Sequence, residues 1–239
     1  MNQYVVEPAA LTTVPVVGSD AVFPVRRVYC IGRNYADHAL EMGVDPREEP
    51  PFFFCKPTDT VVSNAHGPVE VAFPPLTENF HHEVELVVAI GEGGKDIAVE
   101  HAARHVWGYA VGVDLTRRDL QLAMRHSGKP WEIGKTFERC APIGRITPKA
   151  AVGALTSGKI ALTVDGELRQ ESDLSKLIWP VDDIIAILST YFTLAPGDLI
   201  FTGTPHGVNR LEAGNALHAT FDGLDDLHIN IVGAHKELA

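Results

Sequence analysis

The sequence has little cysteine, little positive charge and no long apolar run. Its three cysteines, Cys30, Cys55 and Cys140, are isolated, which argues against a disulfide framework and against metal-binding cysteine pairs. The 20 Lys and Arg residues against 31 Asp and Glu residues give a net charge of −11. Such a surface argues against non-specific binding of nucleic acid or of anionic membranes, so an anionic substrate would need a local cationic pocket.

No stretch is long enough in apolar residues to span a bilayer, and the first residues lack the basic start and apolar run of a secretory signal. We therefore expect a cytoplasmic protein with no nucleic-acid or membrane partner. With 239 residues, of which 45% are hydrophobic, the chain can bury a sizeable core. We find no internal repeat or low-complexity segment.

The most informative pattern is the pair Glu83 and Glu85 at the start of the apolar stretch 84–90. From Val84 the residues predict a strand, and side chains alternate faces along a strand, so both carboxylates point the same way. Like charges this close need a cation between them or a bound proton. Oxygen ligands favour Mg²⁺, Mn²⁺ or Ca²⁺ over zinc. The alternative is the solvated polar face of an edge strand.

Two further stretches end in groups that suit a ligand. The apolar stretch 107–114 predicts a buried strand ending at Asp114, followed by a helix over 117–125 that Thr116 would cap. An acid in that position is as common in a simple strand-end cap as in a ligand site. Lys56 ends the aromatic strand 51–57, where its ammonium group can meet an anion or simply extend to solvent.

Residues 33–43 predict a short helix in which His38 and Glu41, three positions apart, share a face. A helix this short is marginal alone, and the Pro-rich loop 44–51 follows it. This combination is typical of a lid that becomes ordered over a bound ligand. On spacing alone, an ordinary surface pair of side chains is the simpler explanation.

Strands outnumber helices, and no regular alternation of strand and helix is present, which predicts a strand-rich α+β fold. We divide the chain into an N-terminal arm, residues 1–22, and a catalytic domain, residues 23–239. Asp165-Gly166 predicts a two-residue hairpin. Residues 180–191 predict an amphipathic helix whose buried stripe comprises Ile184, Ile185, Ile187 and Leu188. Residues 127–135 predict a loop carrying Lys129 and Lys135.

Several short motifs, in a consistent order from about residue 23 to residue 232, jointly resemble the fumarylacetoacetate hydrolase family. They are Gly32-Arg-Asn-Tyr-Ala-Asp-His38, Phe54-Cys-Lys-Pro57, Glu83-Val-Glu-Leu86, Gly108-Tyr-Ala-Val-Gly-Val-Asp114 with Arg118-Asp-Leu-Gln121, Gly134-Lys135, and Gly197-Asp-Leu-Ile-Phe-Thr-Gly-Thr-Pro205. The stretches 30–35 and 81–86 are most similar to the branch that hydrolyses fumarylpyruvate in gentisate breakdown. The resemblance implies a mixed β-sandwich roll with a lid helix, a homodimer, and bound Mg²⁺ or Mn²⁺.

The resemblance also implies roles for individual residues. It implies metal ligands at Glu83, Glu85 and Asp114, a water-activating pair at His38 and Glu41, a lysine near the reacting carbonyl at Lys135, and substrate contacts at Arg33, Gln121 and Thr204. The chain departs from many members at His82, where they carry an aromatic residue. We do not expect His82 to be a ligand; His81 and His82 either form hydrogen bonds around the site or lie in solvent.

The implied reaction is hydrolysis of a C–C bond in a small anionic 2,4-diketo acid, with fumarylpyruvate giving fumarate and pyruvate. His38, oriented by Glu41, would be the base, and Lys135 would donate to the oxyanion. Arg117 or Arg33 would bind the distal carboxylate, and Lys56 would meet the anionic substrate; a surface Arg at a helix start is the alternative for Arg117.

The same motifs also fit acylpyruvate hydrolysis, oxaloacetate decarboxylation or isomerisation of a 2-hydroxydienoate diacid. A non-catalytic binder of diketo acids or metal, and a β-rich interaction module, are alternatives from other classes. The first leaves the base unexplained, and the second leaves the three carboxylates unexplained.

Overall fold

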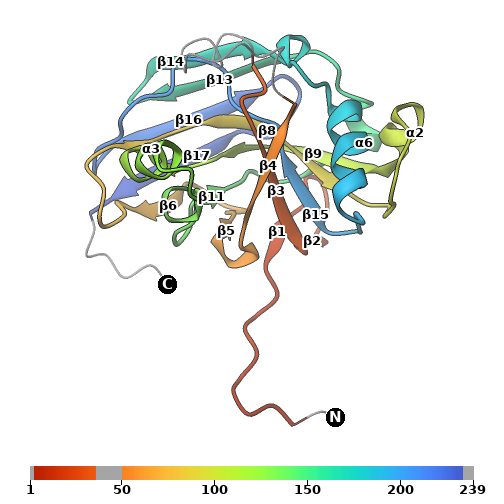
Figure 1. Ribbon diagram of the computed structural model, residues 1–239, viewed down its shortest axis with the longest axis horizontal. Coiled ribbons are helices and arrows are strands. Elements are labelled where there is room, and N and C mark those ends of the chain that lie inside the picture. The colour runs from red at the N-terminus through yellow and green to blue at the C-terminus, as the bar shows by residue number, and fades with distance from the viewer. Residues whose placement is uncertain (1–2, 36–49, 234–239) are drawn as a thin grey trace.

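The computed structural model describes residues 3–35 and 50–233, which form two mixed β-sheets packed face to face (Figure 1). The six-stranded sheet has the order β12-β9-β8-β15-β3-β4, and the five-stranded sheet has the order β14-β13-β16-β17-β6. The strands are β1 Thr13–Pro15, β2 Val22–Pro24, β3 Arg27–Gly32, β4 Phe52–Lys56, β5 Val61–Val62, β6 Val69–Ala72, β7 Phe80–His81, β8 Val84–Ile90, β9 Val106–Val113, β10 Thr116–Arg117, β11 Ala141–Pro142, β12 Thr147–Pro148, β13 Lys159–Val164, β14 Glu167–Asp173, β15 Asp198–Phe201, β16 Ala216–Phe221 and β17 Leu227–Val232. The expected strand-rich α+β class is confirmed.

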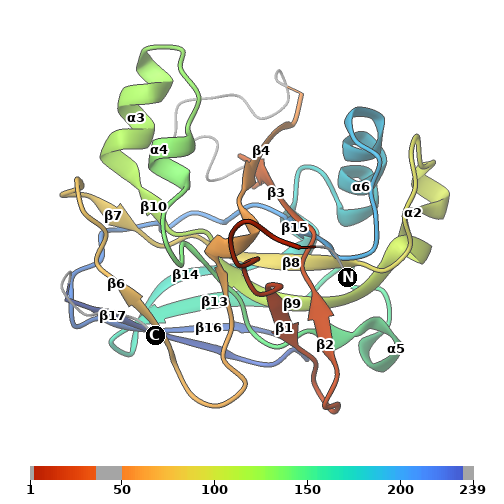
Figure 2. The ribbon, with the colours of Figure 1, turned by 90° about the horizontal axis from the view of Figure 1, so that it is seen from below.

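The helices are short and lie at two opposite ends of the sheets. They are α2 Val99–His105, α3 Arg118–His126, α4 Glu132–Lys135, α5 Lys149–Val152 and α6 Val181–Tyr191, with 3-10 turns η1 Thr58–Thr60 and η2 Leu174–Lys176. Figures 1 and 2 place α2 and α6 together at one end, and α3 and α4 at the other. Within the described residues, no helix has both the length and the apolar character needed to cross a membrane.

The six-stranded sheet is buried on both faces. In β8, Leu86 and Val88 face the main core between the two sheets, whereas Val87 and Ala89 face a second apolar cluster on the other side. This explains why the strand reads as a continuous apolar run rather than as an alternating one. The two-sided burial makes β8 a rigid, central element that can hold side chains at its end in fixed positions.

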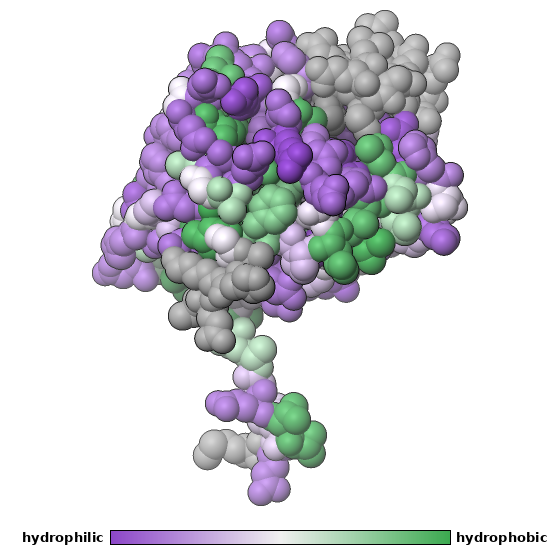
Figure 3. All heavy atoms as spheres, turned by 90° about the vertical axis from the view of Figure 1, so that its left-hand side faces the viewer, coloured by the Kyte–Doolittle hydropathy of each residue, from purple (hydrophilic) through white to green (hydrophobic). Residues whose placement is uncertain are grey.

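The second cluster is closed by the N-terminal segment. β1 pairs with β2, and Val14 of β1 is completely buried in this cluster. Residues 3–12 extend away from the body (Figure 1). The surface seen in Figure 3 is mostly polar, with separate apolar patches.

Several predicted elements are confirmed. The hairpin turn has φ of 52° at Asp165 and 81° at Gly166, the positive values that a type I′ turn requires. In α6 the stripe of Ile184, Ile185 and Leu188 is buried, whereas Ile187 is only partly buried because it lies at the margin of the packed face.

Two local predictions are wrong. Thr116 does not cap α3, because Thr116 lies in β10 and its hydroxyl donates to the carbonyl of Asp114. The segment predicted as a loop contains α4, a single turn whose backbone bonds begin at Trp131. Both departures bring polar side chains, those of Thr116 and Lys135, close to Asp114.

Candidate active site

Three carboxylates meet where β8 and β9 run side by side. The strands are antiparallel, Glu85 lies opposite Gly112, and the amide of Asp114 donates to the carbonyl of Glu83 over 2.8 Å. Glu83 precedes β8 and Asp114 follows β9, so the register brings the two acids opposite each other. One carboxylate oxygen from each of Glu83, Glu85 and Asp114 lies within 4.8 Å of the other two.

These carboxylates are not on a solvated edge. Glu83, Glu85 and Asp114 are 5%, 2% and 1% exposed, and β8 lies between β9 and β15 inside its sheet. Charged groups are seldom buried so completely without a partner. The alternative of a polar edge strand is therefore wrong.

Cationic side chains surround the acids. The ammonium Nζ of Lys135 lies 2.7 Å from Glu83 Oε2, 2.8 Å from Asp114 Oδ2 and 2.8 Å from the hydroxyl of Thr116. The Nζ of Lys56 lies 2.8 Å from Asp114 Oδ1. The guanidinium of Arg118 donates to the other oxygen of Glu83. Three acidic and three cationic side chains thus form one buried cluster in which the formal charges balance.

Burial and like charge perturb these groups. Desolvation, followed by the charges of Asp114 and Glu83, raises the pKa of Glu85 well above its usual range, although the amide of Gly203 donates to its Oε2 over 2.7 Å. Burial is the largest single influence on Lys56 and by itself would lower its pKa, but the charges of Asp114, Cys140 and Cys30 and the hydrogen bond to Asp114 together raise it. The acids therefore repel one another, and positive charge between them would stabilise their ionised forms.

The donor set fits a hard divalent cation. Mg²⁺ binds oxygens at about 2.0–2.1 Å in an octahedron, so its adjacent ligands lie about 2.9 Å apart and its opposite ligands about 4.2 Å apart. The three oxygens lie within 4.8 Å of one another, so they reach these spacings by approaching one another by at most about 1.9 Å through side-chain rotation. Asp114 Oδ1 lies 2.8 Å from Nζ of Lys56, and a carboxylate oxygen in such an ion pair keeps a second lone pair for a metal. Three protein oxygens leave about half of an octahedral shell for water and substrate.

Other predicted site residues lie around this cluster. Arg33, Gln121, Lys135 and Thr204 line one pocket with the three acids, as do Phe54 and Trp131. The space left in that pocket is about 30 Å³, the volume of roughly one water molecule. Because so little space is left, a substrate can enter only when side chains rearrange.

Two predicted substrate contacts lie elsewhere. Lys56 lies behind Asp114, and its ammonium group contacts the carbonyls of Leu115 and Lys135 rather than the pocket. Arg117 packs its guanidinium over Phe137, 4.7 Å from the ring centroid, and donates to the carbonyl of Ile133. Lys56 and Arg117 therefore do not line the pocket that contains the three acids. His38 and Glu41 lie outside the described residues.

Sequence reasoning gave no role to Arg118, which is buried in the pocket wall and also donates to the amide oxygen of Gln121. The signal was present, because Arg118 and Gln121 are three positions apart on the helix that follows Asp114 and must share a face. Burial and Arg118 lower the pKa of the neighbouring His81 to about 4. His81 is therefore neutral near pH 7, and it accepts from Arg118 and contacts Asn79.

Gln170 of β14 reaches the site from the other sheet. Its Nε2 donates to the hydroxyl of Thr204 over 2.8 Å and to the carbonyl of Pro205 over 2.9 Å. Its Oε1 accepts from the amide of Val84 and from Nδ1 of His82. Burial lowers the pKa of His82. His82 is therefore a neutral side chain that forms a hydrogen bond beside the site. This agrees with the first of the two alternatives expected from the sequence, a hydrogen bond rather than exposure to solvent.

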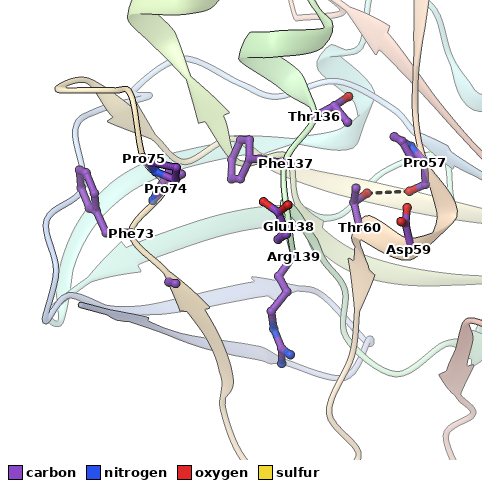
Figure 4. Close-up of a pocket in the computed structure, with 11 residues that line it drawn as sticks. Pro57, Asp59, Thr60, Phe73, Pro74, Pro75, Thr136, Phe137, Glu138 and Arg139 are labelled. Atoms are coloured by element: carbon purple, nitrogen blue, oxygen red, sulfur yellow. Dashed lines mark hydrogen bonds between the residues drawn. The ribbon is translucent and has the colours of Figure 1, made fainter. Parts of the chain in front are cut away.

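A larger cavity of about 680 Å³ lies elsewhere, between the turn after β4 and the segment after α4 (Figure 4). Its wall includes Asp59, Thr60, Phe73, Phe137 and Glu138. It brings together no cluster of acids and bases comparable to the one above, so size alone does not identify the chemical site.

The fold and site define a strand-rich α+β protein in which three clustered carboxylates could hold a hard divalent cation. The chain belongs to the fumarylacetoacetate hydrolase family, since the model "Fumarylacetoacetate (FAA) hydrolase C-terminal" matches residues 27–232. It is 43% identical to fumarylpyruvate hydrolase of Ralstonia sp. over 188 residues, covering 79% of this chain and 96% of the relative. Oxaloacetate tautomerase YcgM of Escherichia coli is 40% identical over 202 residues, covering 84% and 90%.

Among solved structures, the chain is similar to fumarylpyruvate hydrolase from Pseudomonas aeruginosa in complex with Mn²⁺ and pyruvate. The TM-score is 0.95 at 55% sequence identity, covering 96% of this chain and 99% of the other. The expected mixed β-sandwich roll is thereby confirmed.

Proposed function

We propose that this chain is a metal-dependent hydrolase that cleaves fumarylpyruvate to fumarate and pyruvate. The observation that carries the proposal is the buried cluster of Glu83, Glu85 and Asp114 surrounded by cationic side chains. The similarity to fumarylpyruvate hydrolases of Ralstonia sp. and Pseudomonas aeruginosa supports the substrate. The second of these holds Mn²⁺ and pyruvate, which supports a metal beside the product.

The reaction adds water across one C–C bond. Hydroxide adds to the ketone carbonyl carbon of the fumaryl group, the bond from that carbon to the pyruvyl methylene breaks, and the methylene carbon takes a proton to give the methyl group of pyruvate. Glu83, Glu85 and Asp114 would hold Mg²⁺ or Mn²⁺, which supplies Lewis-acid stabilisation of negative charge on the pyruvyl end. We assign the removal of the water proton to His38, oriented by Glu41; such a base contributes about 10²–10⁴-fold.

The pocket wall supplies donors for the oxyanion that forms when water adds. Lys135 Nζ already lies in the pocket and makes three hydrogen bonds to oxygen atoms. Arg118 and the amide group of Gln121 lie on the same wall. Such fixed donors stabilise an oxyanion strongly in a site that excludes water. We assign Arg33, in the same pocket, to the distal carboxylate, and Thr204 to the pyruvyl carboxylate.

The first experiment follows the loss of fumarylpyruvate by absorbance after dialysis against a chelator, with and without added Mg²⁺ or Mn²⁺. Acetylpyruvate and oxaloacetate are run beside it. We expect metal-dependent turnover that is fastest on fumarylpyruvate. Faster tautomerisation of oxaloacetate than hydrolysis of fumarylpyruvate would instead favour the activity named for the Escherichia coli relative.

The second experiment compares His38→Ala with the parent. We expect Mn²⁺ binding to be kept and turnover to fall about 10²–10⁴-fold. Near-normal turnover would remove His38 from the mechanism. We further propose a cytoplasmic homodimer acting in the gentisate pathway; the three free cysteines, Cys30, Cys55 and Cys140, suit a reducing compartment.

A further inference from the structure

Two histidines stand opposite each other on the outer face of the five-stranded sheet. β16 and β17 are antiparallel, and their register pairs His218 directly with His228. The neighbouring Leu217 and Ile229 face the core, so both imidazoles point away from it. Their rings stack, with centroids 4.3 Å apart and planes 5° apart. A central pair of strands thus presents two nitrogen ligands side by side.

A carboxylate completes the group. Asp226 lies just before β17, two residues before His228. Its Oδ2 lies 2.8 Å from Nε2 of His218. One ligand atom from each of His218, Asp226 and His228 lies within 4.8 Å of the other two. This cluster belongs to the other sheet from Glu83, Glu85 and Asp114, so the two groups are independent.

We propose that His218, Asp226 and His228 form a second metal site, which takes a borderline divalent ion such as Zn²⁺. Two imidazoles and one carboxylate are the usual ligands of zinc, and three protein ligands leave a fourth position for water. Ligands on a tetrahedral zinc with bonds of about 2.0–2.2 Å lie about 3.4 Å apart. The ligand atoms therefore approach one another by at most about 1.4 Å.

The sheet makes that approach easy. β17 is hydrogen-bonded to β16 on one side and to β6 on the other, which fixes the backbone of both histidines. The side chains of His218 and Asp226 are 39% and 47% exposed, so they can rotate without disturbing the core. Binding removes the hydrogen that His218 Nε2 and Asp226 share and orients the imidazole lone pairs to the ion.

Neighbouring groups do not compete for the ion. Asp225 is engaged by Arg145 through two hydrogen bonds of 2.8 Å, and the same contact neutralises the charge of Arg145. On β13, the residue opposite His218 is Thr163, which is uncharged. The site therefore offers one carboxylate and two nitrogens.

The two centres should discriminate between metals by ligand type. Carboxylates and water suit Mg²⁺ and Mn²⁺, whereas imidazole suits zinc, nickel and copper. Excess Mg²⁺ should therefore fill the site of Glu83, Glu85 and Asp114 and leave the histidine site open to Zn²⁺.

The test is equilibrium dialysis of the full chain against Zn²⁺ in the presence of excess Mg²⁺. We expect about one equivalent of Zn²⁺ to bind, and His218→Ala or His228→Ala to abolish it. Asp226→Asn should weaken binding at least about tenfold, because replacing even a side chain that only supports a metal ligand costs about 10–100-fold in affinity. The matched control is His101→Ala, an exposed histidine on α2, which should bind Zn²⁺ as the parent does.

Circular dichroism and turnover with Mg²⁺ check that each variant is folded, since these residues lie outside the site proposed for catalysis. The proposal is overturned if His228→Ala retains the Zn²⁺ equivalent, or if His101→Ala loses it equally. Unchanged Zn²⁺ affinity in Asp226→Asn overturns the three-ligand assignment. These outcomes do not depend on which reaction the other site performs.

Discussion

Replacing Gln170 with leucine tests whether the second sheet positions the substrate site. Gln170 is 1% exposed and makes four hydrogen bonds, two of them to Thr204 and Pro205. Because its amide donates to the hydroxyl oxygen of Thr204, the hydroxyl hydrogen must point elsewhere, and Thr204 lines the pocket. Gln170 thus orients Thr204 as a donor toward substrate, which makes it a positioning residue.

The structure sets the magnitude of the effect on stability. Gln170→Leu leaves the amide of Val84, Nδ1 of His82 and the carbonyl of Pro205 without their partner. A buried polar group left unsatisfied costs about 1–3 kcal/mol, and burying the leucine returns about 1.5–3 kcal/mol. Three such groups cost about 3–9 kcal/mol together, so we expect a net loss of at most about 7 kcal/mol, with a central value of about 4 kcal/mol, in the free energy of unfolding, measured by urea denaturation.

The effect on turnover separates positioning from general damage. A hydrogen bond to a charged group contributes about 1.5–3 kcal/mol, so loss of the Thr204 donor should lower kcat/KM about 10–150-fold. In a Thr204→Val background, Gln170→Leu should cause little further loss of kcat/KM, because the group it orients is gone. Assays are run on folded enzyme, well below the unfolding temperature. Losses that multiply in the double variant would refute the reasoning.

The remaining predictions concern charged side chains. Arg33→Ala should lower kcat/KM on fumarylpyruvate about 10–150-fold with a much smaller effect on acetylpyruvate, which lacks the distal carboxylate, whereas Arg117→Ala should show no such selectivity; equal losses on both substrates for Arg33→Ala would reject its role. Arg26→Met should cost about 1–3 kcal/mol, because Arg26, only partly buried itself, pairs over 3.0 Å with the fully buried Asp198. Burial raises the pKa of Asp198 above its unfolded value, so its folded form binds the proton more tightly. The destabilisation should therefore shrink as pH falls through that raised pKa, which unfolding measured across acidic pH will check.

The sequence was sufficient where a pattern is local. The alternation of faces placed Glu83 and Glu85 together, and the Asp-Gly pair at 165–166 identified a hairpin, because both depend on neighbouring residues only. Asp114 could be joined to the two glutamates only through the family resemblance. The structure supplies the physical reason, which is the antiparallel register of β8 and β9.

The sequence was insufficient where distant segments meet. Gln170 contacts His82 across 88 residues, and Lys56 contacts Asp114 across the sheet, so no spacing rule reveals either pair. Arg117 and Arg118 illustrate the same limit. They are adjacent in sequence, yet Arg117 packs on Phe137 whereas Arg118 enters the pocket. The reason is that Arg117 ends β10 and Arg118 begins α3, so their side chains point in different directions.

The charge balance of the pocket links its metal to its substrate. Counted as fully ionised, the three acids are matched by Lys56, Lys135 and Arg118, so the cluster is neutral by itself. A divalent ion makes this cluster net positive and adds to the charge of Arg33 in the same pocket, whereas the chain as a whole, at −11, does not attract an anion. A bound anion in turn offsets the charge of the ion. Metal and keto acid should therefore strengthen each other's binding.

This coupling can be measured without turnover. We expect pyruvate to raise the affinity for Mn²⁺ about 5–150-fold, and Mn²⁺ to raise the affinity for pyruvate by the same factor, because the linkage is reciprocal. Propionate, which lacks the keto oxygen, is the matched control and should have a smaller effect. Lys135→Met removes the cation that lies 2.7 Å from Glu83 and 2.8 Å from Asp114, so it should raise Mn²⁺ affinity while lowering turnover. Equal Mn²⁺ affinity with and without pyruvate, or weaker Mn²⁺ binding in Lys135→Met, would contradict the charge argument, because both effects follow from the same neutral cluster.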